Sequence, residues 1–321
     1  MKLAMYKSKQ GERPALVVDH SVLDLTAWNH DGHAGTGSGD SIIPYLDPEG
    51  SLHQSARQLA DEFQSGGEAA QKLRDRKIVY ALDSVCLAPP LRPRLILCGA
   101  MGYKDHLDEM DVSSLPKTPD AFIKLSSCVI GPDEPIALPA IEPDMVDFEC
   151  ELSVVFSRRC HCVSEDEALS YIGGITMIND VGSRKGLPEW EESVATGDAL
   201  SSMNLFHRII RGKQFATFCP LGPVVTTIDE IDDLADINLG TRLNGQVMQS
   251  ANTSNLIFSV AQSVSYFSRW YEFRPGDVLS TGSPAGVGYA QDPKVFLSPG
   301  DSVEVYADRV GALVNTIVAP G

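Results

Sequence analysis

The chain has 321 residues, of which 43% are hydrophobic and 21% charged, and its formal net charge is −17. This length allows one large domain with a small appendage and a buried core, and the composition is close to that of soluble globular proteins. The acidity argues against nucleic acid or an anionic membrane as a partner. No apolar run approaches the roughly 20 residues that cross a bilayer, and the N-terminal stretch lacks a secretory signal, so we expect a cytoplasmic enzyme.

The first part of the chain, to about residue 85, is predicted to form a small separate unit. Strand-like runs at 16–18 and 22–25 flank a turn, a Gly- and Ser-rich loop covers 29–40, and helical patterns follow at 55–64 and 68–76. The proline-rich stretch 88–93 reads as a linker, because each proline removes a backbone donor and restrains the residue before it. The sequence therefore predicts a small N-terminal α/β domain over 1–90 and a catalytic domain over 91–321.

The second part of the chain is dominated by short apolar segments separated by turn signals at 131–133, 274–277 and 298–301. Helices are expected only briefly. One begins at the capping box of residues 164–167 and ends at Gly173-Gly174, and another runs from about 254 to 270. The catalytic domain is thus predicted to be mainly β, within an α+β fold.

The cysteines of the chain number seven, which does not indicate a disulfide framework in a long chain without a secretory signal. The cluster Cys160-His161-Cys162 contains residue types that bind zinc. No second Cys/His pair stands at the spacing of a structural zinc site, so the cluster is interpreted as an exposed strand end.

Two acidic side chains on one strand are the strongest chemical signal. With a period of two residues, Glu149 and Glu151 point to the same side, with Cα atoms roughly 6–7 Å apart. Two such carboxylates repel each other unless a cation or a proton lies between them. Taken alone, the pair fits a solvent-facing acidic strand better than a site.

The strand that follows changes this balance. Residues 175–179 are apolar and end abruptly at Asp180, where a carboxylate is well placed to anchor a site. Three carboxylates without a His or Cys ligand describe a hard oxygen site for Mg²⁺ or Mn²⁺, with Ca²⁺ as an alternative. We therefore predict that Glu149, Glu151 and Asp180 are metal ligands.

A histidine and a glutamate three residues apart form a second candidate. In a helical turn His106 and Glu109 share one face, so Glu109 could orient His106 as a general base. An incidental pair on a surface helix is the alternative.

Further along, residues 281–288 are Gly-rich but lack the Lys-Ser/Thr of a phosphate-binding loop. Close approach of this backbone to a small ligand, with the hydroxyls of Thr281 and Ser283 on either side of Gly282, is the favoured interpretation.

Taken in order, these segments resemble the fumarylacetoacetate hydrolase family over roughly residues 95–318. Each piece alone is weak, whereas the ordered set is specific. The matching segments are Gly-Tyr-x-x-His-x-x-Glu at 102–109, Phe-Ile-Lys at 122–124, Glu-x-Glu at 149–151, Asn-Asp at 179–180, Gly-Lys-x-Phe at 212–215, Leu-Asn-Gly…Gln at 243–249 and Thr-Gly-Ser-Pro-x-Gly-Val-Gly at 281–288.

The resemblance implies a mixed β-roll catalytic domain that forms homodimers. It implies a metal ion on Glu149, Glu151 and Asp180, and a catalytic His106–Glu109 pair on a lid segment. It also implies that a lysine reaches the reacting carbonyl, and Lys213 stands at that position. The residues expected to bind substrate are Lys124, Arg184, Thr281, Gly282 and Ser283.

The chain also departs from the family's pattern. Leu187 replaces a glutamine that helps polarise a carbonyl in hydrolytic members, and the stretch 187–211, with Trp190 and Phe206, is longer than usual and is expected to shape the acyl end of the pocket. The fourth carboxylate of the larger hydrolases would fall near Gly99, so the site is expected to have three ligands.

The leading expectation is C–C bond hydrolysis of an acylpyruvate or another 1,3-diketo acid. The metal would act as a Lewis acid, His106 would deprotonate water, and Lys213 would stabilise the developing oxyanion. Decarboxylation of a β-keto acid such as oxaloacetate is the alternative, and hydratase, lyase or tautomerase activity stays open. A non-catalytic ligand-binding homologue is the least favoured reading, because binding alone does not need the His–Glu pair.

Overall fold

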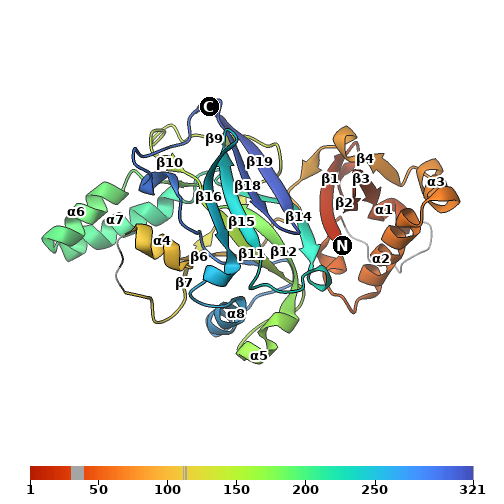
Figure 1. Cartoon of the computed structure of the whole chain (residues 1–321), viewed down its shortest axis with the longest axis horizontal. Helices are drawn as coiled ribbons and strands as arrows, with labels where there is room; N and C mark the ends of the chain where they lie inside the picture. Colours follow the sequence, from red (N-terminus) through yellow and green to blue (C-terminus); the bar gives the residue numbers. More distant parts are fainter. Residues whose placement is uncertain (30–39, 111, 113, 321) are drawn as a thin grey trace.

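The computed structural model describes residues 1–29, 40–110, 112 and 114–320. The molecule is elongated, with the N-terminal unit at one end and a pair of helices at the other (Figure 1). Most of the stretch 29–40, which was predicted to be a loop, lies outside the described residues.

The N-terminal unit is an antiparallel sheet covered by helices, as the sequence predicts. The strands are β1 (Lys2–Ser8), β2 (Gly11–Val18), β3 (Ser21–Asp24) and β4 (Val79–Ala81), and the helices are α1 (Leu25–Trp28), α2 (Ser51–Gln64) and α3 (Gly67–Asp75). Helix α2 buries Ala56, Leu59 and Phe63, whose spacing of three and four residues places them on one face. The predicted strands and both predicted helices of this unit are confirmed, with α2 four residues longer than expected at its start.

This sheet does not stop at the predicted domain boundary. Strand β1 pairs with β14 (Cys219–Thr227) of the second part of the chain, and β5 (Leu87–Ala88) also pairs with β1. These backbone hydrogen bonds join the two sides of the predicted boundary between residues 90 and 91. The division into two domains therefore stays a prediction. The resulting sheet continues from β14 through β12 (Ile172–Asn179), β11 (Cys150–Phe156), β17 (Val278–Ser280), β6 (Ile96–Ala100) and β7 (Asp120–Lys124).

A second sheet packs on the first. It contains β16 (Gln246–Asn252), β15 (Asn238–Leu243), β18 (Ser302–Ala307), β19 (Gly311–Val318) and β9 (Ile136–Ala137). Leu152 and Val154 of β11 lie in one core cluster with Leu239 and Val305 of the second sheet. The result is the mainly β, α+β architecture expected from the sequence, with β11 at its centre.

The long helices near residue 200 were not anticipated. Helices α6 (Leu187–Thr196) and α7 (Ala199–Gly212) project from the body of the molecule (Figure 1). Gly197 ends α6 in the left-handed conformation, with φ at 76°, and the Asp198 side chain accepts a 3.1 Å hydrogen bond from Ser201 N at the start of α7. No helix in the described part of the chain is long and apolar enough to cross a membrane.

Two predicted helix boundaries were wrong. The capped helix α5 (Glu165–Ala168) ends early, and Gly173 and Gly174 belong to β12. A Cβ on Gly174 would lie 2.5 Å from the carbonyl oxygen of Thr226, so this glycine serves close strand packing rather than a helix end. Helix α8 (Val260–Ser268) begins only after Ser259, which forms a capping box with Gln262, and the residues Thr253–Asn255 form a separate 3-10 turn.

The Cys160-His161-Cys162 cluster is only partly exposed. Cys160 is fully buried and pairs its backbone with that of Phe273, whereas His161 and Cys162 are exposed. The prediction of an exposed strand end is thus wrong for Cys160, because this residue packs in the same core cluster as the stacked rings of Phe156 and Phe273.

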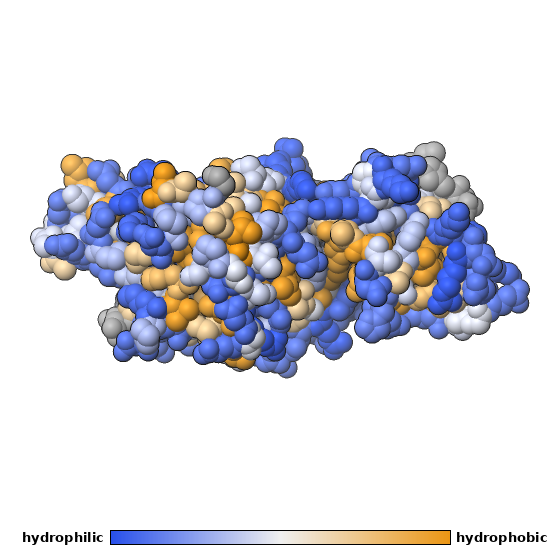
Figure 2. All heavy atoms as spheres, turned by 90° about the horizontal axis from the view of Figure 1, so that it is seen from above, coloured by the Kyte–Doolittle hydropathy of each residue, from blue (hydrophilic) through white to orange (hydrophobic). Residues whose placement is uncertain are grey.

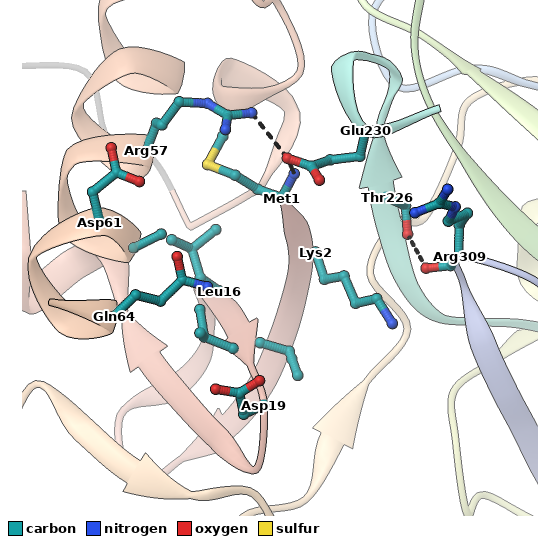
Figure 3. A pocket seen from close by; sticks show the side chains of 13 residues that line it. Met1, Lys2, Leu16, Asp19, Arg57, Asp61, Gln64, Thr226, Glu230 and Arg309 are labelled. Carbon is teal, nitrogen blue, oxygen red and sulfur yellow. Dashed lines mark hydrogen bonds and ion pairs between the residues drawn. The ribbon is translucent and has the colours of Figure 1, made fainter. Parts of the chain in front are cut away.

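An ion-pair cluster joins α2 to the segment after β14. Arg57 donates to both Asp229 and Glu230, and a cavity of about 460 Å³ opens beside this contact (Figure 3). None of the predicted site residues lines this cavity, so we assign it no role in the chemistry.

Candidate metal centre

The ends of two neighbouring strands bring the predicted ligands together. Cys150 of β11 pairs with Asn179 of β12, so Glu149 and Asp180 flank the same end of the two strands. Asp180 N donates a 2.8 Å hydrogen bond to the Glu149 carbonyl, and Glu149 N donates to the Asn179 side chain at 3.1 Å. Glu149, Glu151 and Asp180 are 7%, 1% and 0% exposed. The alternative of a solvent-facing acidic strand is therefore wrong.

Three cationic side chains converge on these carboxylates. Lys213, directly after α7, places Nζ 2.6 Å from Glu149 Oε2 and 2.7 Å from Asp180 Oδ2. Lys124, at the end of β7, donates to Asp180 Oδ1 and, at 3.0 Å, to the Val181 carbonyl. Arg184 donates to Glu149 Oε1. The predicted substrate-binding residues Lys124 and Arg184 and the predicted catalytic Lys213 thus contact the acidic cluster itself.

The charges divide the two glutamates into different electrostatic environments. Burial alone would raise the pKa of Glu149, but the Arg184 guanidinium and the Lys213 ammonium lower it below the usual range. Burial, together with the charges of Asp180 and Glu149, raises the pKa of Glu151 well above the usual value. Among the described residues, the hydrogen-bond donor to the Glu151 carboxylate is the Ser280 hydroxyl. Glu151 is therefore the carboxylate with the greatest deficit of positive charge.

This arrangement fits a divalent cation. Oxygens of Glu151 and Asp180 and the Sγ atom of Cys98 all lie within 4.8 Å of one another. Ligand atoms around Mg²⁺ or Mn²⁺ stand roughly 2.1 Å from the ion, so donors on opposite sides are about 4 Å apart. A cation between Glu151 and Asp180 would also supply the positive charge that Glu151 lacks. Glu149 is joined to this group through the Lys213 ammonium that it shares with Asp180.

The Gly-rich segment 281–288 lies against the same site. Thr281 Oγ1 donates to the Leu152 carbonyl at 3.0 Å, and Ser283 Oγ accepts a 2.9 Å hydrogen bond from the Gln249 side chain. Gly282 has φ at 86°, and a Cβ there would meet Gly102 N at 3.1 Å, so glycine is needed for this close approach. The structure places the three predicted substrate-binding residues together, with both hydroxyls engaged by protein groups.

The His106–Glu109 pair lies on the short helix α4 (Lys104–Glu109). His106 Nδ1 is 2.7 Å from Glu109 Oε1, and Gly286 N donates to Glu109 Oε2 at 2.8 Å. The side chains are 12% and 18% exposed, so the alternative of an incidental surface pair is wrong. If Nδ1 carries the proton that Glu109 accepts, Nε2 is left as the proton acceptor. His106 also lies close enough to Glu149 for a positive charge on its ring to lower the pKa of this carboxylate.

The helices α6 and α7 are fastened to this site at several points. Leu187 begins α6 and donates its backbone N–H to the Arg184 carbonyl at 2.9 Å. The Tyr289 hydroxyl donates to both oxygens of Glu191 at 3.2 Å. The rings of Trp190 and Phe206 pack in a tilted pair with centroids 6.5 Å apart.

Three further residues of the site were not predicted. Asp147 accepts hydrogen bonds from Arg184 Nε at 3.0 Å, from Gly288 N at 2.8 Å and from Tyr289 N at 3.0 Å. Its position two residues before Glu149, in the same alternation, was a signal that could have found it. Cys98 and Ser280 stand in ordinary strand sequences, and nothing in the sequence around them marks them.

The fold is a mixed β-roll, and its buried carboxylates can hold a divalent cation beside an oriented His–Glu pair. This combination is typical of metal-dependent enzymes. The family model described as fumarylacetoacetate (FAA) hydrolase C-terminal matches residues 95–318. The chain belongs to this family, as the sequence resemblance indicated.

The chain is also similar to individual named proteins. The chain is 33% identical over 263 residues to the mitochondrial oxaloacetate tautomerase of Rattus norvegicus, covering 80% of this chain and 79% of that protein. It is 32% identical over 289 residues to a mitochondrial oxaloacetate tautomerase of Homo sapiens, covering 88% and 86%.

Solved structures share the fold over the whole chain. A fumarylacetoacetate hydrolase from psychrophilic Exiguobacterium antarcticum superposes with a TM-score of 0.74 at 28% identity, covering 99% of both chains. A maleylpyruvate hydrolase from Sphingobium, solved with manganese(II) and pyruvate, superposes with a TM-score of 0.73 at 23% identity, covering 100% of both chains. At that identity the second likeness speaks for the fold alone.

Proposed function

We propose that this protein is a divalent-metal-dependent keto–enol tautomerase of a short 2-keto dicarboxylic acid of the oxaloacetate type. The observation that carries the proposal is the 2.7 Å contact between His106 Nδ1 and Glu109 Oε1, with Glu109 itself held by Gly286 N. This contact supplies an oriented base beside the acidic cluster. The names of the relatives from Rattus norvegicus and Homo sapiens support the same reaction.

In this proposal the cation is Mg²⁺ or Mn²⁺, and Glu149, Glu151 and Asp180 hold it. When bound, it supplies Lewis-acid polarisation of the 2-keto group. Arg184 and Lys213 lower the pKa of Glu149 and keep it ionised, and Lys124 donates a hydrogen bond to Asp180 Oδ1. Ser280 orients Glu151 through its hydroxyl hydrogen bond.

The chain's own proton-transfer group is His106. Its Nε2 atom takes a proton from C3 of the keto acid, the C3–H electron pair moves into a C2–C3 double bond, and the π pair of the C2–O bond moves onto the 2-oxygen. The same proton then goes to the 2-oxygen, which gives the enol, and the reverse sequence restores the keto form. Glu109 accepts the Nδ1 hydrogen bond throughout and stabilises the transient imidazolium.

The C–C hydrolysis expected from the sequence is the second candidate, because the same Nε2 atom could deprotonate a water molecule. Hydrolysis needs, in addition, a polar partner for the attacked carbonyl, and the buried Leu187 stands where hydrolytic members are expected to carry glutamine. Decarboxylation of oxaloacetate needs no water and is less affected by this change. Tautomerisation requires the fewest groups beyond those described, and a binding-only role has no need of the His106–Glu109 contact.

Three assays on one preparation test the proposal. With Mn²⁺ present, the ultraviolet absorbance of enol-oxaloacetate reports tautomerisation, CO₂ release reports decarboxylation, and the enol absorbance of acylpyruvates reports hydrolysis. We expect tautomerisation to be the fastest of these, and to fall by about 10²–10⁴ in His106→Ala. The matched control is His161→Ala, which removes an exposed imidazole remote from the pair. Faster acylpyruvate cleavage than tautomerisation in the wild type, or full tautomerase activity in His106→Ala, would contradict the proposal.

The remaining expectations stay proposals as well. We propose a small keto acid as substrate and a homodimer as the assembly, with neither nucleic acid nor membrane as a partner. The sequence favours a cytoplasmic location, whereas the two named relatives are described as mitochondrial. Fractionation of cells that carry the tagged protein distinguishes the two compartments.

A further inference from the structure

A thiol faces the acidic cluster from the neighbouring strand. Cys98 lies at the centre of β6, which pairs with β17 and so stands beside Ser280 and the strand of Glu151. It is fully buried, and its Sγ atom lies within 4.8 Å of an oxygen of Glu151 and of an oxygen of Asp180. Among the described residues, no hydrogen bond is made by this thiol. A buried, unpartnered donor atom therefore completes the group formed by the two carboxylates.

We propose that Cys98 becomes an additional ligand when a thiophilic cation such as Zn²⁺ or Cd²⁺ occupies this site, so that such cations can displace the Mg²⁺ or Mn²⁺ of the proposed function. This inference rests on the proposed function, because it takes Glu151 and Asp180 as ligands. It goes beyond the expected three-ligand oxygen site, for which neither a fourth donor nor a sulfur atom was anticipated.

The chemistry of the ligand atoms explains why softer cations would be bound. Carboxylate oxygens alone suit hard cations, whereas a thiolate selects softer ones, and Zn²⁺ accepts mixed sulfur and oxygen ligands in a four-coordinate shell. Ligand atoms at roughly 2.0–2.3 Å from Zn²⁺ stand about 3–4 Å apart, which the mutual limit of 4.8 Å allows. On binding, the S–H bond breaks, a sulfur–metal bond forms and the proton leaves to solvent.

The neighbouring cysteines show that position, rather than residue type, singles out Cys98. Cys219 of β14 is also fully buried and also lies near Lys124 and Asp180, but it is not part of the group with both carboxylates. Cys219→Ala is therefore a matched control, because it removes a buried thiol at the same side of the sheet.

The test is direct observation of sulfur–metal bonding in the full chain. After chelation and buffer exchange, Cd²⁺ is titrated and the thiolate-to-Cd²⁺ charge-transfer absorbance is recorded, together with the dissociation constants of Cd²⁺ and Mn²⁺ by calorimetry. We expect a one-to-one charge-transfer signal in the wild type and in Cys219→Ala. We expect it to be absent in Cys98→Ala and Cys98→Ser, with Cd²⁺ affinity lowered on the order of tenfold or more and Mn²⁺ affinity nearly unchanged.

The possible outcomes separate the two proposals. An unchanged charge-transfer signal in both Cys98 variants, or its loss in Cys219→Ala alone, overturns the role of Cys98 while leaving the carboxylate site intact. Absence of binding by either cation in the wild type overturns the metal site, and with it the proposed function. Cys98→Ser replaces sulfur with a hydroxyl of similar shape, so it decides the matter even if Cys98→Ala does not fold.

Discussion

Lys213 Nζ donates a 2.6 Å hydrogen bond to Glu149 Oε2, which joins the end of α7 to the residue before β11. The same ammonium reaches Asp180 Oδ2 at 2.7 Å. A single lysine thus neutralises two proposed metal ligands that come from adjacent strands. This position differs from the expected one, in which Lys213 addresses the reacting carbonyl of the substrate.

Removal of this charge is expected to make stability depend on metal. In Lys213→Met, the buried carboxylates lose a partner, so the free energy of unfolding should fall by about 3 kcal/mol in chelator. Mn²⁺ should restore a larger part of the loss than it adds to the wild type, because a cation replaces the missing charge. Urea unfolding with EDTA and with Mn²⁺ measures both effects.

The control for this variant is Lys185→Met. Lys185 makes an exposed ion pair with Asp144 at 3.4 Å, so its loss should change the free energy of unfolding by no more than about 0.5 kcal/mol. Equal stability of Lys213→Met and wild type in chelator would show that the buried contact contributes nothing net.

Ser280 is predicted to increase the metal affinity of the site by holding the Glu151 carboxylate in position. Its hydroxyl donates to Glu151 Oε2, and such support of a ligand usually contributes about 10- to 100-fold in metal affinity. Ser280→Ala should therefore weaken Mn²⁺ binding by that factor in calorimetry. Ser265→Ala, which removes a buried hydroxyl that donates to the Val163 carbonyl, is the control with unchanged affinity. Identical dissociation constants for Ser280→Ala and wild type would refute this role.

Asp229 is predicted to make the contact between α2 and the segment after β14 sensitive to acid. Burial opposes its ionisation, but the hydrogen bond from Thr227 and the Arg57 charge lower the pKa of Asp229 to about 2. Because the folded pKa lies below the unfolded value of about 3.9, the stabilisation is present above pH 4 and is lost as the pH falls toward 2. Asp229→Asn should thus unfold at lower temperature than wild type at pH 7, with the difference shrinking toward pH 2.

The measurement for Asp229 is thermal unfolding across this pH range. Asp232→Asn is the comparison, because Asp232 is 90% exposed and pairs with Arg309 at the surface. A difference between Asp229→Asn and wild type that stays constant from pH 7 to pH 2 would contradict the assigned pKa.

The sequence was sufficient to find the buried acidic cluster because its signal is local. Period-two alternation put Glu149 and Glu151 on one face, and the abrupt end of an apolar run marked Asp180. The N-terminal helices were predictable for the same reason, since spacing and caps are local features. The alternation also contained Asp147, which was overlooked although it shares the face of Glu149.

The parts that the sequence did not predict depend on contacts between distant segments. Cys98 reaches the cluster only because β6 pairs with β17, and Ser280 reaches Glu151 because β17 pairs with β11. Gly174 looked like a helix end, but the close approach of β14 explains it. The helices α6 and α7 were not predicted, although Gly197 ends the first and Asp198 caps the second.

A homodimer is predicted from the family resemblance, and the surface offers apolar area for it. Figure 2 shows hydrophobic side chains at the end of the molecule where α6 and α7 lie, and Val194, Leu200 and Met203 of these helices are more than half exposed. Exposed apolar patches of this kind mark interaction sites. Light scattering after size exclusion should give twice the 34.7 kDa of the chain. A mass of one chain at micromolar concentration would exclude a stable dimer.

The Tyr289 hydroxyl is predicted to hold α6 in place over the Gly-rich segment. Burial and the Glu191 carboxylate raise the pKa of Tyr289 to about 12, so the phenol stays protonated and donates to Glu191 at neutral pH. The Tyr289 backbone meanwhile donates to Asp147, the partner of Arg184. Tyr289→Phe removes the hydroxyl alone and should loosen α6 without disturbing this backbone contact.

The loss of such a hydrogen bond costs about 1 kcal/mol, which corresponds to roughly a fivefold change in an equilibrium constant. We therefore expect KM for oxaloacetate to rise about fivefold with kcat nearly unchanged, and amide exchange in residues 187–196 to accelerate. Tyr80→Phe, at a partly buried tyrosine of the N-terminal unit that packs against Tyr6, should change neither quantity. Faster amide exchange in residues 187–196 without any change in KM would show that Tyr289 stabilises α6 but that α6 takes no part in substrate binding. Unchanged exchange would contradict the role of Tyr289 in stabilising α6.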